Sequence, residues 1–298
     1  MDSLAFSNVN EGDAADWVDA STYAKGARVV RNRHVFESLI DGNKGNDPVI
    51  AVTAPSWLDL GAVNKWRMFD KRAADGAWLI GKATVNAESI VVRLKMGAVV
   101  NAIALVGLKG SSVKVTMTDA NPEEGEAGVV YTDTKSLADY GIDNMYDYYF
   151  APIPRKTTAL FLDLPAYGTA EIEVSVMYPG GNAEIGMIVL GDLIDLGRTT
   201  KGSELALQNY SATTRDALGS VKDISRGSTR ILDFDLRIPM KSFDNAFQTL
   251  ERLKDTPVAW IGSRKYDSAV VIGRYEQLRM PWSDESFAQT KLEVWSLQ

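Results

Sequence analysis

The sequence predicts a mainly β protein with three parts in series. An aromatic- and glycine-rich stretch lies within residues 1–62, strand patterns dominate residues 63–196, and one amphipathic helix lies among strands in residues 197–298. Successive strands without helical periods between them are typical of a β-sandwich, whereas a mixed series is typical of an α+β domain. We therefore expect a small β domain, a central jelly-roll β-sandwich and a C-terminal α+β domain with an extended arm.

The first part places large aromatic rings at wide intervals. Trp17, Tyr23, Phe36 and Trp57 are separated by turn glycines, a short β-branched segment and a Pro-containing loop. So short a stretch cannot build an ordinary core, and large rings are one of the few ways to bury enough surface without disulfides or metal. We expect the four rings to form the core of this module. The alternative is that they contact a ligand, and we keep them as candidate binding residues.

The order of these residues resembles the small chitin-binding-type carbohydrate-binding modules, which also occur as adaptors in bacteriophage tail proteins. The resemblance covers roughly residues 10–70, and residues 64–70 (NKWRMFD) resemble a junction that follows such modules in phage virion proteins. It implies a phage tail or baseplate component. Sugar-binding members carry exposed aromatic residues near the positions occupied here by Leu39 and Ile40, so the resemblance supports the scaffold rather than a sugar platform.

The central part shows strands separated by turn signals such as Asn121–Gly125 and Pro179–Asn182. Val113, Val115 and Met117 alternate with polar residues, as expected of a strand with one buried face. The segments with strand character are 88–94, 102–106, 113–118, 158–164, 171–178 and 185–190.

The last part begins with a polar stretch at 202–221, rich in Gly, Ser and Thr, which we expect to be an extended arm or loop rather than a packed element. A strand is predicted at 229–238. A helix is predicted at 242–253, with Ser242 as its cap and Pro257 preventing its continuation. Further strands are predicted at 258–262, 269–273 and 292–297. The apolar stripe of the helix comprises Phe243, Ala246, Phe247, Leu250 and Leu253.

Composition excludes several classes of function. The chain has 298 residues, enough for two or three domains, with a net charge of −7 and no block of Lys and Arg. We therefore expect no nucleic-acid partner. The absence of cysteine excludes disulfides and thiolate metal sites. The longest mainly apolar run, residues 98–108, is too short to span a bilayer, so we expect no membrane insertion.

Catalytic motifs are missing from the sequence. His34 is the single histidine, on a predicted turn between two strands, and we interpret it as a surface turn residue. No nucleophile elbow, phosphate-binding loop or zinc-protease motif occurs. We expect no enzyme, no cofactor and no metal. Paired carboxylates acting alone, as in glycosidases, leave a glycan-degrading enzyme as a third hypothesis.

Residues 138–150 (ADYGIDNMYDYYF) form the strongest local candidate for a binding site. Tyrosine offers a flat apolar face with a hydroxyl, and aspartate accepts hydrogen bonds from sugar hydroxyls. Subunit contact, saccharide binding, Ca²⁺ binding by aspartates and a plain surface loop are the alternatives. The candidate binding residues are Tyr140, Asp143, Tyr146, Asp147, Tyr148 and Tyr149.

Together these features predict a structural virion protein of a phage tail, in the tail tip, baseplate or collar. Such a protein docks neighbouring tail subunits and forms a homo-oligomer, with assembly in the host cytoplasm and final location in the virion. The alternative is a receptor-recognising tail protein that binds a host surface glycan.

Overall fold

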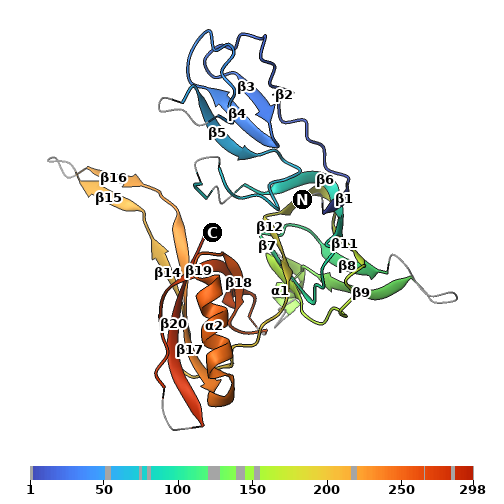
Figure 1. Cartoon of the computed structure of the whole chain (residues 1–298). Coiled ribbons are helices and arrows are strands. Elements are labelled where there is room, and N and C mark those ends of the chain that lie inside the picture. Colours follow the sequence, from blue (N-terminus) through green and yellow to red (C-terminus); the bar gives the residue numbers. More distant parts are fainter. Residues whose placement is uncertain are drawn as a thin grey trace. The chain divides into compact units, whose positions relative to one another are not determined.

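The computed structural model describes residues 3–50, 55–73, 76–78, 82–119, 128–138, 145–150, 155–215, 220–264, 266–282 and 286–297. These residues form a mainly β protein, which confirms the expected class (Figure 1). The chain divides into two compact units, Met1–Leu193 and Ile194–Gln298. The first unit contains two separate hydrophobic cores and the second unit contains one.

Residues 15–62 of the first unit include a small sheet, here called the N-terminal sheet, with strand order β2-β3-β4-β5. β3 and β4 form a hairpin whose two turn residues, Asn32 and Arg33, both have positive φ. Two such residues are characteristic of the type I′ turn, which matches the twist of paired strands. The strands are β2 (Ala15–Asp16), β3 (Arg28–Arg31), β4 (His34–Ser38) and β5 (Trp57–Ala62).

The rest of the first unit, here called the two-sheet region, contains two antiparallel sheets. Among the described residues, one sheet has the order β1-β6-β11-β8-β9 and the other the order β10-β7-β12. A short helix, α1 (Met145–Phe150), precedes β10. The strands are β1 (Leu4–Ser7), β6 (Thr84–Lys95), β7 (Ala102–Val106), β8 (Ser112–Thr118), β9 (Val129–Ser136), β10 (Thr158–Phe161), β11 (Glu171–Ile185) and β12 (Met187–Gly191).

Both sheets of this region contribute to one core. Val113, Val115 and Met117 of β8 are buried, as their alternation predicted. Ile103 and Leu105 of β7, the middle strand of its sheet, belong to the same cluster. The period of two therefore directs one face of each strand to a shared interior.

Three details differ from the sequence prediction. β11 continues through Pro179–Asn182 as an irregularity opposite β6, where Glu88 has a φ of 61°, so the expected turn is a bulge. β9 was missed because its side chains are exposed or half-buried and lack an apolar alternation. Residues 145–150, expected in a loop, are helical.

The second unit is an antiparallel sheet with α2 (Phe243–Leu253) against one face (Figure 1). The order is β13-β17-β20-β19-β18, and β14 also pairs with β17. Short 3-10 turns, Met240–Ser242 and Asp267–Ala269, precede α2 and β19. The strands are β13 (Arg198–Thr199), β14 (Glu204–Asn209), β17 (Ser228–Pro239), β18 (Val258–Ile261), β19 (Val270–Arg279) and β20 (Phe287–Ser296).

The predicted inward face of β17 is confirmed, but the predicted stripe on α2 is only partly right. Phe247 is 43% exposed, whereas Ala246, Thr249 and Leu250 are buried. Ser242 precedes the helix as expected, yet its side chain makes no capping hydrogen bond, because it ends a 3-10 turn instead. The inward residues of β17 are Leu232, Phe234, Leu236 and Ile238.

The extended arm expected at 202–221 contains paired strands in its described part. β14 pairs along the first half of β17, and the chain continues into the hairpin of β15 (Ala212–Arg215) and β16 (Val221–Ile224). Figure 1 shows this hairpin projecting from the sheet of the second unit. We call residues 204–215 and 220–230 the arm. Its strands were missed because the segment is exposed and lacks an apolar alternation.

Replacing Leu250, which is fully buried between α2 and the sheet, should destabilise the second unit. Leu250→Ala leaves a cavity, so the free energy of unfolding should fall by about 3 kcal/mol in urea titrations. The exposed neighbour Gln248 supplies the control, since Gln248→Ala should change it by less than about 0.5 kcal/mol. Equal effects of the two substitutions would contradict the packing described for α2.

Candidate functional site

The four aromatic residues predicted in the N-terminal module lie together. Phe36 and Trp57 are buried with Val29, and Trp17 and Tyr23 pack against them. The rings of Tyr23 and Trp57 meet edge to face with centroids 5.4 Å apart, and the Trp57 indole N–H donates to the Asn46 carbonyl at 2.8 Å. The four rings therefore form the small core of the N-terminal sheet.

The tyrosine- and aspartate-rich candidate is described only in part. Tyr140 and Asp143 lie outside the described residues, as do the side chains of Asp147 and Tyr148. Tyr146 and Tyr149 lie on α1 and are 70% and 67% exposed. These two rings are thus accessible to a partner or a ligand.

Three aliphatic side chains of the N-terminal module are exposed to solvent. Leu39 and Ile40 are 37% and 43% exposed, and Leu58 on β5 is 48% exposed. Aliphatic side chains lack the flat ring that stacks on a sugar. This part of the module offers an apolar surface without an aromatic platform.

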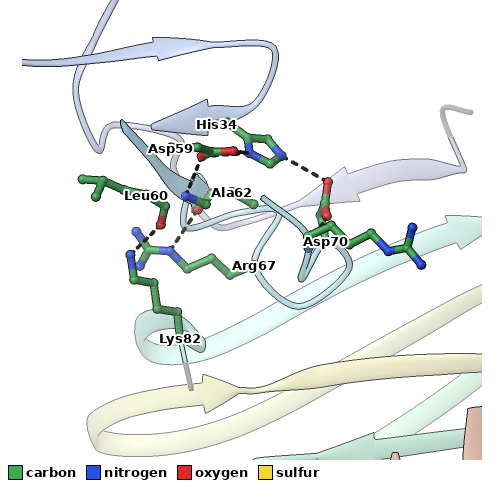
Figure 2. A network of polar contacts seen from close by, with 9 residues as sticks. His34, Asp59, Leu60, Ala62, Arg67, Asp70 and Lys82 are labelled. Carbon is green, nitrogen blue, oxygen red and sulfur yellow. Dashed lines mark hydrogen bonds and ion pairs between the residues drawn. The ribbon is translucent and has the colours of Figure 1, made fainter. Parts of the chain in front are cut away.

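A charged cluster, here called the junction cluster, connects the N-terminal sheet to the segment 64–70 that leads into the two-sheet region. Figure 2 shows His34, the first residue of β4, between Asp59 of β5 and Asp70. Its Nδ1 donates to the Asp59 carboxylate at 2.9 Å, and its Nε2 donates to the Asp70 carboxylate at 3.3 Å. The ring therefore bridges two parts of the chain.

Ionisation follows from this geometry. The hydrogen bonds to Asp59 and Asp70 raise the pKa of His34 from 6.5 to about 9, against the opposing effect of burial. His34 likewise lowers the pKa of Asp70. At neutral pH the imidazolium is thus paired with two carboxylates. Because both ring nitrogens donate to carboxylates, neither is available as a general base.

Further hydrogen bonds extend the junction cluster to the segment 64–70. The Arg67 guanidinium donates to the Ala62 carbonyl at 3.1 Å and pairs with Asp13 at 3.1 Å. The Lys82 ammonium donates to the Leu60 carbonyl at 2.5 Å (Figure 2). The end of β5 is thus hydrogen-bonded both to Arg67 within the segment and to Lys82 beyond it.

The same segment is anchored in the two-sheet region. Met68 is fully buried in its core, the Met68 N–H donates to the Thr84 hydroxyl, and the Met68 carbonyl accepts from the Ile188 N–H, each at 3.0 Å. Lys71 nearby is buried, and burial lowers its pKa to about 8. The segment 64–70 contacts both the N-terminal sheet and the two-sheet region. The junction cluster therefore holds the N-terminal sheet to the two-sheet region.

The interpretation of His34 as a surface turn residue was wrong. Its side chain is only 15% exposed, and its partners lie 25 and 36 positions away in the sequence. Local pattern cannot reveal such pairing. The only available signal was the position of the histidine directly before the apolar residues Val35 and Phe36 of a strand.

The arm of the second unit is paired into strands but exposed to solvent. Every residue of β14 is exposed, including Leu205 at 46% and Leu207 at 66%, and Val221 of β16 is 54% exposed. Among the described residues β14 pairs only with β17, so its other edge is open. Open, apolar strand edges are usually covered in folded proteins, because they invite pairing with another chain.

Two other kinds of feature are absent from the described part of the chain. No group of three or more His, Cys, Asp or Glu residues there has an arrangement that could hold a metal ion. Neither α1 nor α2, the two α-helices described, is long and apolar enough to cross a membrane.

Comparison with known proteins adds no relative. No protein-family model matches the chain, and no curated protein or solved structure is significantly similar to it. Function is therefore inferred from the contacts of the chain itself, chiefly those of the junction cluster and the arm.

The junction cluster predicts a specific pH dependence of stability. The pKa of His34 is raised in the folded state, so its contribution is fully present below pH 6.5 and is lost as the pH rises to about 9. His34→Gln should lower the free energy of unfolding by about 2 kcal/mol at pH 6, allowing for partial exposure. The difference between the two proteins should shrink by pH 9.5, as measured by urea titration at each pH.

The matched control for this measurement is Asp41→Asn, which removes an exposed carboxylate from the same module outside the cluster. Its effect should stay constant between pH 6 and pH 9.5. Parallel pH profiles of wild type and His34→Gln would show that the imidazolium does not stabilise the junction.

Proposed function

We propose that the chain is a structural virion subunit of a phage tail, in the tail tip, baseplate or collar, and that its role is to dock neighbouring subunits. The observation that carries the proposal is the arm, an exposed hairpin with apolar side chains and an open strand edge. Such a surface in a monomer would be an aggregation hazard, whereas in an assembly subunit it is a contact surface.

The finer domain layout belongs to the same proposal. The N-terminal sheet with its aromatic core is compatible with a carbohydrate-module-like adaptor, and the five-strand and three-strand sheets around one core are compatible with a jelly roll. The sheet with a single packed helix is compatible with the α+β domain. We place the domains at residues 1–62, 63–196 and 197–298, with β1 of the first segment contributing a strand to the sheet of the second.

The junction cluster also supports a mechanical role. It engages both nitrogens of the single histidine in ion pairs and ties the adaptor-like sheet to the next part of the chain. A rigidly held module transmits force and position between neighbours, and we infer no catalytic step for it. Other tail subunits and further copies of this chain are the proposed partners.

A receptor-recognising function is the second candidate, because the Tyr146 and Tyr149 rings are exposed on α1. Exposed tyrosines stack on sugar rings and donate hydrogen bonds from their hydroxyls. This candidate requires a host surface glycan as ligand and no turnover.

Light scattering of the purified full chain at several concentrations tests the docking role. We expect a concentration-dependent oligomer, and we expect Leu205→Ser with Leu207→Ser to weaken it by about tenfold in dissociation constant through lost apolar contact. The control replaces two similarly exposed valines of the first unit, Val99→Ser with Val129→Ser, and should change nothing. A monomer at every concentration would count against self-assembly.

Glycan titration tests the second candidate. If α1 binds a saccharide, Tyr146→Ala with Tyr149→Ala should reduce affinity for host polysaccharide by about tenfold or more, since each stacked ring contributes about 1 kcal/mol. Tyr167→Ala, at a tyrosine that is 40% exposed elsewhere in the unit, is the control. Absence of binding by the wild-type chain in a glycan array would remove this candidate.

A further inference from the structure

The open edge of β14 presents the backbone groups of alternate residues. In an antiparallel pair, the N–H and C=O of successive residues point alternately toward the paired strand and away from it. The Tyr210 N–H donates to the Gly227 carbonyl at 3.2 Å, in register with the pairing of β14 and β17. Even-numbered residues of β14 therefore bond to β17. The backbone groups of Leu205, Leu207 and Asn209 point to the edge that is unpaired among the described residues.

The apolar side chains of β14 are symmetric about Ala206. Leu205 pairs directly with Leu232, which is buried in the core, so both side chains lie on the same face of the sheet. Leu207 lies on this face too, because side chains two positions apart in a strand point the same way. Both leucines of β14 are exposed, so the apolar surface of the core continues uncovered onto the arm. The pattern Leu-Ala-Leu is the same in both chain directions.

A second copy of β14 fits this edge in one antiparallel register. With Ala206 opposite Ala206 of the second copy, each Leu205 lies opposite a Leu207, and the free backbone groups of these residues meet as hydrogen-bonded pairs. Glu204 then lies opposite Gln208, so no like charges meet. A shift of two residues in either direction leaves a single leucine pair. A shift of one residue places free backbone groups opposite groups already bonded to β17.

This coincidence favours an identical strand over an unrelated one. An unrelated strand would need leucines at the same spacing and in the same hydrogen-bonding phase, whereas a second copy has both by symmetry. Pairing of identical antiparallel strands is isologous, so each copy gives and receives the same contacts. It covers Leu205 and Leu207 of both copies, and it satisfies the backbone groups of the open edge.

We propose that β14 of one copy pairs antiparallel with β14 of a second copy, with two-fold symmetry about Ala206. This inference rests on the proposed role as an assembly subunit and names the surface and the partner. By itself the contact joins two copies, and it extends the sheet of the second unit across the symmetry axis.

Disulfide trapping tests the register, because the chain has no cysteine of its own. In the proposed pairing the two Ala206 residues form a non-hydrogen-bonded pair with Cα atoms about 4.5 Å apart, a separation that a disulfide bridges. Under mild oxidation the full chain with Ala206→Cys should become mostly covalent dimer. Leu205→Cys and Leu207→Cys, which test neighbouring registers, and the exposed Gln248→Cys on α2 should stay mostly uncross-linked.

Charge at Gln208 tests the same pairing without a cross-link, since this residue meets Glu204 twice in the symmetric contact. In light scattering at low salt, Gln208→Lys should strengthen self-association by about fivefold, and Gln208→Glu should weaken it by a similar factor. The difference should shrink at high salt. The matched controls, Gln248→Lys and Gln248→Glu, make the same changes on α2 and should leave association unchanged.

Urea unfolding of every variant establishes that the fold is retained. If the wild-type chain self-associates, the edge pairing is overturned by equal association of the two Gln208 variants. It is also overturned if Ala206→Cys cross-links no better than the cysteines at 205, 207 and 248. In either case the assembly role stands. A wild-type chain that stays monomeric at every concentration, with Ala206→Cys remaining uncross-linked, counts against both.

Discussion

Every sheet in this protein is subject to the same constraint: a strand that turns one face to a hydrophobic core leaves its other face, and sometimes its edge, to be satisfied elsewhere. β8 meets the constraint by burying Val113 and Val115 while its polar residues alternate outward. β17 does the same beneath α2. The remaining feature of functional interest, the arm, is what the core of the second unit leaves uncovered.

The junction cluster satisfies the constraint in a different way, with charge rather than apolar surface. The N-terminal sheet is too small to bury much area, and its core consists mainly of five residues. An imidazolium held by two carboxylates therefore contributes proportionately more there than it would in the larger two-sheet region. Its partners are Asp59 of β5 and Asp70 at the end of the segment 64–70. The cluster therefore stabilises the connection between the N-terminal sheet and the following segment, in addition to the pairing of β4 with β5.

By itself, the sequence determined the mainly β class, the alternation of β8 and β17 and the aromatic core of the first module, because these depend on local period and side-chain size. It also located α2 between strands. It did not show that the polar stretch after Gly202 is a hairpin, because strand pairing in an exposed segment leaves no apolar pattern.

Only the tertiary structure decided where charges meet. His34 reaches Asp59 and Asp70 across 25 and 36 positions, and Glu204, Asp233 and Glu293 become neighbours through the register of three strands. Ion pairing acts over a few ångströms in space, whereas separation along the chain carries no information about it until the strands are paired. The class of the fold is thus a local property of this sequence, and its candidate sites are products of register and packing.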